Sequence, residues 1–252
     1  MKYLSLKELF TKLNLDKLNI PIIYEDNDIL VLNKAPGILV HGENSIVDWL
    51  VKKYPNIKSV GEDPTRPGIV HRLDKDTSGI LLIAKNQKTF EYLKEQFQQR
   101  KIKKKYIALV YGKLKTESGL IDLAIGKSKK DFRKKTTQKA IGKIREAVTE
   151  YKVLKRFNNF TLVEAYPKTG RTHQIRVHLK AIGHPVVCDK LYGRKKEVCP
   201  LDLSRHFLHA SSLEFNLPAS LTQGGPSGAR IKLEADLPRD LQATLTELEK
   251  GI

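Results

Sequence analysis

Cysteine is scarce in this sequence, with Cys188 and Cys199 the two thiols among 252 residues. Two cysteines are too few for a disulfide framework, and they lack the CxxC spacing of common zinc sites. We therefore expect reduced thiols and a protein of the cytoplasm. Long apolar runs are also missing, which argues against a membrane-spanning helix, since such a helix needs about 20 apolar residues. The N-terminal stretch MKYLSLKELFTKLNL holds no uninterrupted apolar region of the kind found in secretory signals.

Acidic residues are few relative to basic ones. There are 28 Asp and Glu against 46 Lys and Arg, which leaves a net charge of +18. A basic surplus of this size favours a polyanionic partner, because each neutralised phosphate releases counterions from a nucleic acid. The basic residues are spread through the chain and are not confined to one tail. Nucleic acid is thus the expected partner, and a charge that serves solubility alone is the alternative.

The chain also lacks internal repeats and Gly-, Ser- or Pro-rich linkers. Helical apolar spacing over Leu4–Leu15 predicts that residues 1–19 form a short helical N-terminal extension. No change of composition divides the sequence after that point, so residues 20–252 are expected to form one catalytic domain.

Helix and strand signals then follow one another without strict alternation. Strands are predicted at Ile22–Tyr24, Ile29–Leu32, Ile80–Ala84, Tyr106–Tyr111, Val148–Leu154, Thr161–Ala165, Phe207–Phe215 and Ile231–Leu233. Helices are predicted at Ser45–Tyr54, Gln87–Gln99, Thr172–Ile182 and Pro238–Lys250, with Ser45 as an N-cap and Gly183 closing the third. Residues 55–68 are predicted to be a loop, and the basic residues 127–145 a loop or hairpin. The pattern predicts an α+β fold with a largely antiparallel sheet.

A dense polar cluster, HRLDKDTSG at residues 71–79, stands directly before the apolar run ILLIA. Asp74, Asp76 and Ser78 match the start of an EF-hand calcium loop. Such a loop needs a carboxylate at its twelfth position, and that position is Lys85, which excludes the calcium site.

Two interpretations of this cluster remain. Asp76-Thr77-Ser78-Gly79 is good turn chemistry, in which the Asp and Thr side chains cap backbone amides before the strand. Asp74 can instead be a catalytic carboxylate at a sheet edge, flanked by Arg72 and Lys75. The residues of the cluster alone leave both open.

The stretch HRLDKDTSGILLIAKN at residues 71–86 is similar to the signature HRLDxxTSGxhhhAK of the RluA-type RNA pseudouridine synthases, where h is apolar. Four further blocks resemble that family and occur in its order: YEDNDILVLNKAPGILVH at 24–41, KKYIALVYG at 104–112, GRTHQIRVHLKAIGHPVVCDKLYG at 170–193 and RHFLHASSLEF at 205–215. Together they extend over roughly residues 20–240. A lone R-L-D would be weak evidence, whereas this ordered set is specific.

Two positions depart from the family's pattern. Cys188 stands where the family usually has Gly before Asp189, and Leu217 stands where a His commonly precedes Pro218. Many relatives also carry an N-terminal S4 RNA-binding module. The predicted extension is too short for one, so a member without that module is expected.

The resemblance implies a pseudouridine synthase fold, with a largely antiparallel mixed sheet flanked by helices and loops around a central RNA-binding cleft. It also implies a reaction in which the N-glycosidic bond of a uridine breaks, the base turns, and a carbon of the base rejoins the sugar. No atom leaves, so neither a cofactor nor a metal is expected. Because the detached uracil is kept and reused, one positioned carboxylate can suffice. That role falls to Asp74.

The family implies two further catalytic residues beside Asp74. Arg176 would pair with its carboxylate; the alternative is a solvated basic helix face shared with His173 and Lys180. Tyr106, which opens an alternating strand, would stack beneath the target base, a contact that contributes about 1–3 kcal/mol. For this tyrosine the alternative is packing in the core.

Basic residues near these positions are the expected RNA contacts. A uridine inside a folded RNA must be extruded, and Arg72 would occupy the vacated space. The other predicted RNA-binding residues are Arg171, His173, Lys104 and Lys105, with residues 127–145 a candidate for phosphate contacts. His71 is expected to hydrogen-bond locally.

The leading hypothesis is an RNA pseudouridine synthase that acts on structured RNA, rRNA in preference to tRNA. It is expected to be a cytoplasmic monomer with no membrane or small-molecule partner. A second hypothesis is a non-catalytic RNA-binding ribosome assembly factor, which the charge suits equally well. An unrelated glycosidase or nuclease is disfavoured, because no convincing second carboxylate or metal cluster accompanies Asp74.

Overall fold

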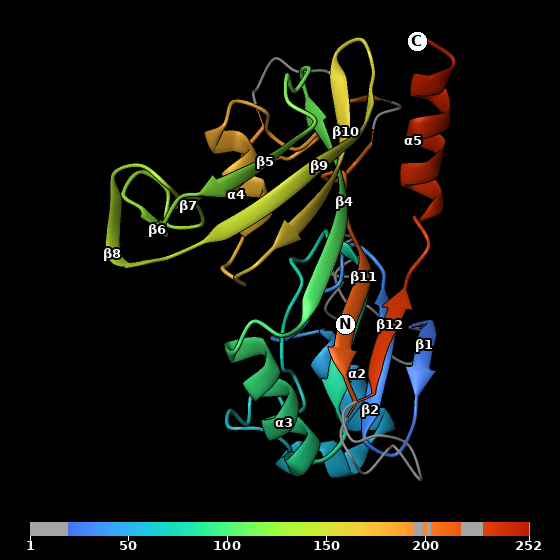
Figure 1. The fold of residues 1–252 in the computed structure, drawn as a ribbon. Helices are drawn as coiled ribbons and strands as arrows, with labels where there is room; N and C mark the ends of the chain where they lie inside the picture. Colours follow the sequence, from blue (N-terminus) through green and yellow to red (C-terminus); the bar gives the residue numbers. More distant parts are fainter. Residues whose placement is uncertain (1–19, 194–198, 201–202, 218–228, 252) are drawn as a thin grey trace, which may run out of the picture.

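The computed structural model describes residues 20–193, 199–200, 203–217 and 229–251. The helical extension predicted for residues 1–19 lies outside them. A nine-stranded sheet forms the body of the described chain (Figure 1). Its strand order is β1-β2-β3-β11-β4-β10-β9-β5, and β12 pairs with β11.

Antiparallel pairing dominates this sheet. The strands are β1 (Ile22–Glu25), β2 (Ile29–Lys34), β3 (Ser78–Ala84), β4 (Lys103–Tyr111), β5 (Ser118–Asp122), β9 (Val148–Arg156), β10 (Phe160–Pro167), β11 (Leu208–Asn216) and β12 (Arg230–Glu234). Within the described residues, β3 and β11 are the one parallel pair of neighbours in it. The predicted α+β class with a largely antiparallel sheet is confirmed.

The helices flank this sheet (Figure 1). They are α2 (Ile46–Lys53), the short 3₁₀ helix η2 (Pro55–Ser59), α3 (Gln87–Gln98), α4 (Gln174–Ala181) and α5 (Arg239–Glu249). Ser45 caps α2 as predicted, and its amide donates to the Asp48 carboxylate at 2.9 Å. None of the helices among the described residues is long and apolar enough to cross a membrane.

Alternation along β4 explains how helices cover both faces of the sheet. Ala108 and Val110 belong to the apolar cluster that includes Ile175 and Leu179 of α4. The intervening Leu109 belongs to the cluster that includes Leu241 and Leu248 of α5, on the opposite face. Side chains of a strand alternate between faces, so one short apolar run anchors two helices.

The basic stretch near 127–145 is more ordered than a loop. It forms a second sheet of β6 (Ile125–Ser128), β7 (Lys135–Thr136) and β8 (Ala140–Arg145), in the order β7-β6-β8. Figure 1 shows this sheet reaching out from the body of the molecule. Residues 125–145 are called the arm below.

Local boundaries differ from prediction at two places near the polar cluster. The turn covers Asp74–Thr77, with the Thr77 amide donating to the Asp74 carbonyl at 3.1 Å, and Ser78 already belongs to β3. Helix α4 begins at Gln174, two residues later than predicted, because His173 has a left-handed backbone with φ of 59°. Gly183 follows that helix with φ of 89°, as a C-terminal glycine should.

Candidate active site

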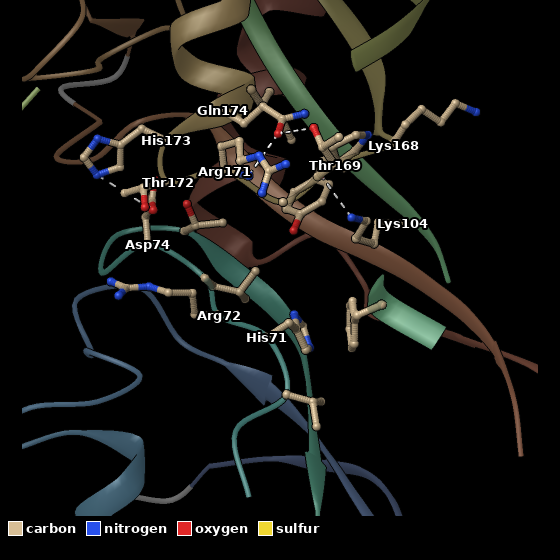
Figure 2. Close-up of a pocket in the computed structure, with 18 of the residues that line it drawn as sticks. His71, Arg72, Asp74, Lys104, Lys168, Thr169, Arg171, Thr172, His173 and Gln174 are labelled. Atoms are coloured by element: carbon tan, nitrogen blue, oxygen red, sulfur yellow. Dashed lines mark hydrogen bonds and ion pairs between the residues drawn. The ribbon is translucent and has the colours of Figure 1, made fainter. Parts of the chain in front are cut away.

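A cavity of about 610 Å³ opens beside the turn that leads into β3. Its walls come from residues 66–77, α3, β4 and the segment 167–176. Seven of the eight predicted site residues line it: Arg72, Asp74, Lys104, Tyr106, Arg171, His173 and Arg176. Figure 2 shows His173 beside Asp74, with a dashed line between the imidazole and the carboxylate. A volume of this size can enclose a ligand as large as a nucleoside.

Asp74 lies in the turn that precedes the interior strand β3. The sequence pattern suggested a catalytic carboxylate at a sheet edge, but β3 has β2 on one side and β11 on the other. Gly79 permits the close approach to β11, because a Cβ there would lie 2.2 Å from the Ala210 carbonyl oxygen. The Asp74 side chain is 17% exposed, so the carboxylate is reachable from the cavity but largely shielded from water.

A buried lysine fixes the turn that carries Asp74. The Lys34 Nζ donates to the carbonyls of Ala35, Ile38 and Lys75 at 2.8, 3.0 and 2.9 Å. Burial lowers the pKa of Lys34 to about 7. These three bonds tie the Pro-Gly turn after β2 to the residue next to Asp74.

Arg176 joins two carboxylates. Its Nη1 donates to Asp74 Oδ2 at 2.8 Å, which confirms the predicted pairing. Its Nε and Nη2 donate to the two oxygens of Asp189 at 2.7 and 2.8 Å. Burial by itself lowers the pKa of Arg176, but the hydrogen bonds and charges of Asp189 and Asp74 raise it above its ordinary value. The guanidinium is therefore a fixed positive charge that orients the Asp74 carboxylate.

Strand β4 supplies the opposite wall. Tyr106 is partly buried in the cavity, and burial together with the charge of Asp74 raises the pKa of its phenol. The Lys104 ammonium donates to the Thr169 carbonyl at 3.1 Å (Figure 2). Burial and the charge of Arg171 lower the pKa of Lys104 to about 8. Lys105 is not among the cavity-lining residues, because the strand alternates.

Lys105 belongs to a different surface. Its Nζ lies 3.5 Å from a Glu164 oxygen and 3.8 Å from a Glu234 oxygen. Its predicted contact with RNA stays a prediction.

The other predicted residues line the same cavity. Arg171 donates through Nε to the Glu146 carbonyl at 2.9 Å. Arg72 Nη1 lies 2.6 Å from His41 Nε2 and is exposed. His173 Nε2 lies 3.9 Å from Asp74 Oδ1, and burial lowers the pKa of its imidazole.

Outside the predicted set, His71 makes the local contacts expected of it. Its Nε2 accepts from the Leu82 amide at 2.9 Å, and its ring stacks on Phe97 with centroids 5.0 Å apart. This contact holds the residues before Asp74 against β3 and α3.

Sequence reasoning missed the roles of Asp189 and Tyr192. Both belong to the D-x-x-Y-G block, so the signal was present, but nothing in it shows which side chains are buried against Arg176. Burial alone would raise the pKa of the Asp189 carboxyl, and the bonds and charge of Arg176 lower it below its ordinary value. The Tyr192 ring lies 5.1 Å from the Arg176 guanidinium carbon.

The turn also has partners that the capping interpretation did not predict. Thr77 Oγ1 lies 2.8 Å from His206 Nε2, and Ser78 Oγ lies 2.9 Å from His209 Nδ1. These hydroxyls therefore bond to histidines that are about 130 residues away in sequence.

Residues 28–181 match the family described as RNA pseudouridylate synthase. The uncharacterized RNA pseudouridine synthase YlyB of Bacillus subtilis is 40% identical over 94% of this chain and 75% of its own length. The ribosomal large subunit pseudouridine synthase D of Borreliella burgdorferi is 44% identical over 70% of this chain, and the match spans 56% of that protein.

A solved structure agrees with these sequence matches. Human RNA Pseudouridylate Synthase Domain Containing 4 superimposes with a TM-score of 0.69 at 27% identity, covering 90% of this chain and 92% of that one. The predicted pseudouridine synthase fold is thereby confirmed. Because the family match covers most of the chain and includes the Asp74 turn, β4 and Arg176, this protein belongs to the RNA pseudouridylate synthase family.

Proposed function

We propose that this protein isomerises specific uridines of large-subunit ribosomal RNA to pseudouridine, with Asp74 as the catalytic carboxylate. The observation that carries the proposal is the Arg176–Asp74 pair at 2.8 Å inside a cavity that is wide enough for a nucleoside. The RNA class is argued from relatives named as ribosomal large subunit pseudouridine synthases. The non-catalytic binding alternative gains no support from the comparisons.

Each side chain of the site has a distinct part in this proposal. The Asp74 carboxylate acts on the uridine. Arg176 holds that carboxylate in one orientation, so the reacting oxygen is already in position when the substrate binds. Tyr106, on the facing strand, offers its ring to the extruded base. Cleavage of the N-glycosidic bond and formation of the C-glycosidic bond conserve all atoms, so the reaction as proposed needs no added reactant.

The cavity rim suits an extruded nucleotide. Arg72 is exposed beside Asp74 and can fill the gap that the base leaves in its helix. Lys104, Arg171 and His173 surround the cavity and are proposed to contact the RNA backbone. Action as a cofactor-free monomer in the cytoplasm is part of the same proposal.

The test is the substitution Asp74→Asn, which keeps the size of the side chain and removes its charge. Isomerisation of a large-subunit rRNA transcript should fall by more than about 1,000-fold, because the catalytic group is lost. Carbodiimide labelling of the treated RNA detects the mass-silent product, and a gel-shift titration should give unchanged RNA affinity.

A matched control is Asp76→Asn, which removes the same charge two residues away in the same turn and should retain activity within about tenfold. Near wild-type conversion by Asp74→Asn would end the mechanistic proposal. Conversion of tRNA but not of the rRNA transcript by the wild-type protein would end the choice of substrate.

A further inference from the structure

Tyr192 lies between the arm and the active site and has partners in both. Its side chain is 2% exposed. The Lys135 amide, in β7 of the arm, donates to its hydroxyl at 2.8 Å. The same hydroxyl lies 2.8 Å from His173 Nδ1, in the segment that faces Asp74.

The Tyr192 ring makes a second connection between the same regions. It packs with Ile125, the first residue of the arm, and with Ala147, two residues beyond the last. On the active-site side, the Arg176 guanidinium carbon lies 5.1 Å from the ring centroid, a cation–π contact. One buried side chain thus contacts the base of the arm, Arg176 and His173.

The hydrogen bonds of Tyr192 assign the proton on His173. A buried phenol needs an acceptor for its hydrogen, and the Lys135 amide can only donate. The Tyr192 hydroxyl therefore donates to His173 Nδ1. A neutral imidazole then carries its hydrogen on Nε2, which lies 3.9 Å from Asp74 Oδ1.

Charged groups around His173 agree with a neutral ring. Asp74 and Asp189 favour the protonated imidazole, while Arg176 and Arg72 disfavour it. Together with burial, which has the largest effect, they leave the pKa of His173 below its ordinary value. The ring can thus present one N–H toward the Asp74 carboxylate at neutral pH.

The composition of the arm is that of a surface that binds a polyanion. Residues 125–145 contain nine Lys or Arg and one Asp. Phe132 stands at the β6–β7 turn and is 88% exposed. An exposed aromatic ring among cations is typical of surfaces that bind single-stranded or looped nucleic acid.

We propose that Tyr192 is a positioning residue that couples RNA binding by the arm to the orientation of Asp74. RNA held on the arm favours the arrangement in which the Lys135 amide stays on Tyr192, and Tyr192 in turn holds His173 and Arg176 against the carboxylate. The inference rests on the proposed function, because it concerns the rate of that reaction.

The first experiment is Tyr192→Phe, which removes the hydroxyl and keeps the ring. The single-turnover rate constant at saturating RNA should fall about tenfold, because the hydroxyl loses its hydrogen bonds to His173 and to the Lys135 amide, while RNA affinity stays within about twofold of wild type. The control is Tyr151→Phe, which also removes a buried phenol hydroxyl. That hydroxyl bonds to Thr116 Oγ1 at 2.9 Å, and the bond does not reach the site. This control should keep the wild-type rate.

The second experiment tests the coupling with substitutions of exposed residues, which leave the folded core intact. Lys129 and Lys130 are exposed residues of the arm, and both are changed to Ala. In the wild-type background this pair should lower the rate at saturating RNA as well as the affinity. In the Tyr192→Phe background the same pair of substitutions should lower the affinity alone, because the hydrogen bonds of Tyr192 between the arm and the active site are already lost.

The outcomes separate this inference from the proposed function. A wild-type rate for Tyr192→Phe would overturn the positioning role, and additive effects of the arm and Tyr192 changes on the rate would overturn the coupling. An arm variant that affects affinity alone in the wild-type background would also overturn the coupling. Absence of pseudouridine with the wild-type protein would instead reject the proposed function.

Discussion

Arg176 shows how much of the site depends on the shape of one side chain. Its planar group makes one hydrogen bond to Asp74 and two to Asp189, whose side chain is fully buried. An ammonium group cannot reproduce this fork, since it is a point charge on a flexible stem. Charge alone is therefore not enough at this position.

We predict that Arg176→Lys lowers the free energy of unfolding by about 2 kcal/mol, because Asp189 loses part of its buried partner. Activity should fall more than about tenfold, because Asp74 loses its fixed donor. Urea unfolding and single-turnover assays measure the two effects. As a control, Arg230→Lys alters an ion pair with Glu214 at the surface and should cost less than about 1 kcal/mol. Equal stability losses in the two variants would contradict the assignment.

The resemblance to the family, and not the residue types alone, predicted part of this site. It pointed to Asp74 and Arg176 as a pair, and their hydrogen bond is present at 2.8 Å. The burial of Asp189 was not predictable, since it depends on how the segment after α4 folds back over the helix. The backbone at Cys188 has a left-handed φ of 57°, which is why glycine suits this position in the family pattern; nothing in the structure explains the cysteine.

At the scale of elements, His206 joins the start of β3 to the segment before β11. It is 4% exposed and lies 2.8 Å from Thr77 Oγ1. Burial and the charge of Arg176 lower the pKa of His206 to about 4. The folded protein therefore binds this proton less readily than the unfolded chain does.

We predict that stability falls on acidification from pH 6.5 toward pH 4, because the unfolded state takes up the His206 proton first. A single group of this kind contributes at most about 1.4 kcal/mol per pH unit in that window. His206→Gln keeps an acceptor for Thr77 and removes the titration, so its unfolding free energy should change less between pH 6.5 and 4. Urea midpoints at the two pH values measure this, and identical slopes for both proteins would contradict it.

Helices and strands with a clear apolar periodicity in the sequence were predicted well. Short or mostly exposed strands were not. The alternation in β4 and the apolar stripe of α4 are long enough to specify their partners, and both elements lie where expected. Strand β5 was missed because its five residues, SGLID, contain turn-forming types and one buried side chain. The arm was predicted only as a loop or hairpin, since its strands are short and mostly exposed.

For the whole molecule, the charge of +18 bears on how RNA binding responds to salt. Each phosphate contact contributes about 0.7–0.9 to the slope of log affinity against log salt concentration. Changing the exposed arm residues Lys129 and Lys143 to Ala should reduce the slope by about 1.5 if both bind phosphates. Filter binding at several salt concentrations measures it.

Lys155→Ala is the control for this measurement. Lys155 pairs with Glu249 of α5 at 2.7 Å, on the side of the sheet opposite α4. Its removal should leave the slope unchanged. A slope that drops equally for this variant would mean that the charge acts as a diffuse field and not through contacts of the arm.

The parallel junction of β3 and β11 has a mechanical consequence. Only two residue pairs connect these strands in the described sheet, His209 with Ser78 and Ala210 with Gly79, whereas β2 and β3 share six. The side-chain contacts of Thr77 with His206 and of Ser78 with His209 cross the same junction. The Asp74 turn therefore stands where side-chain packing, more than a long ladder of backbone hydrogen bonds, joins the two parts of the sheet.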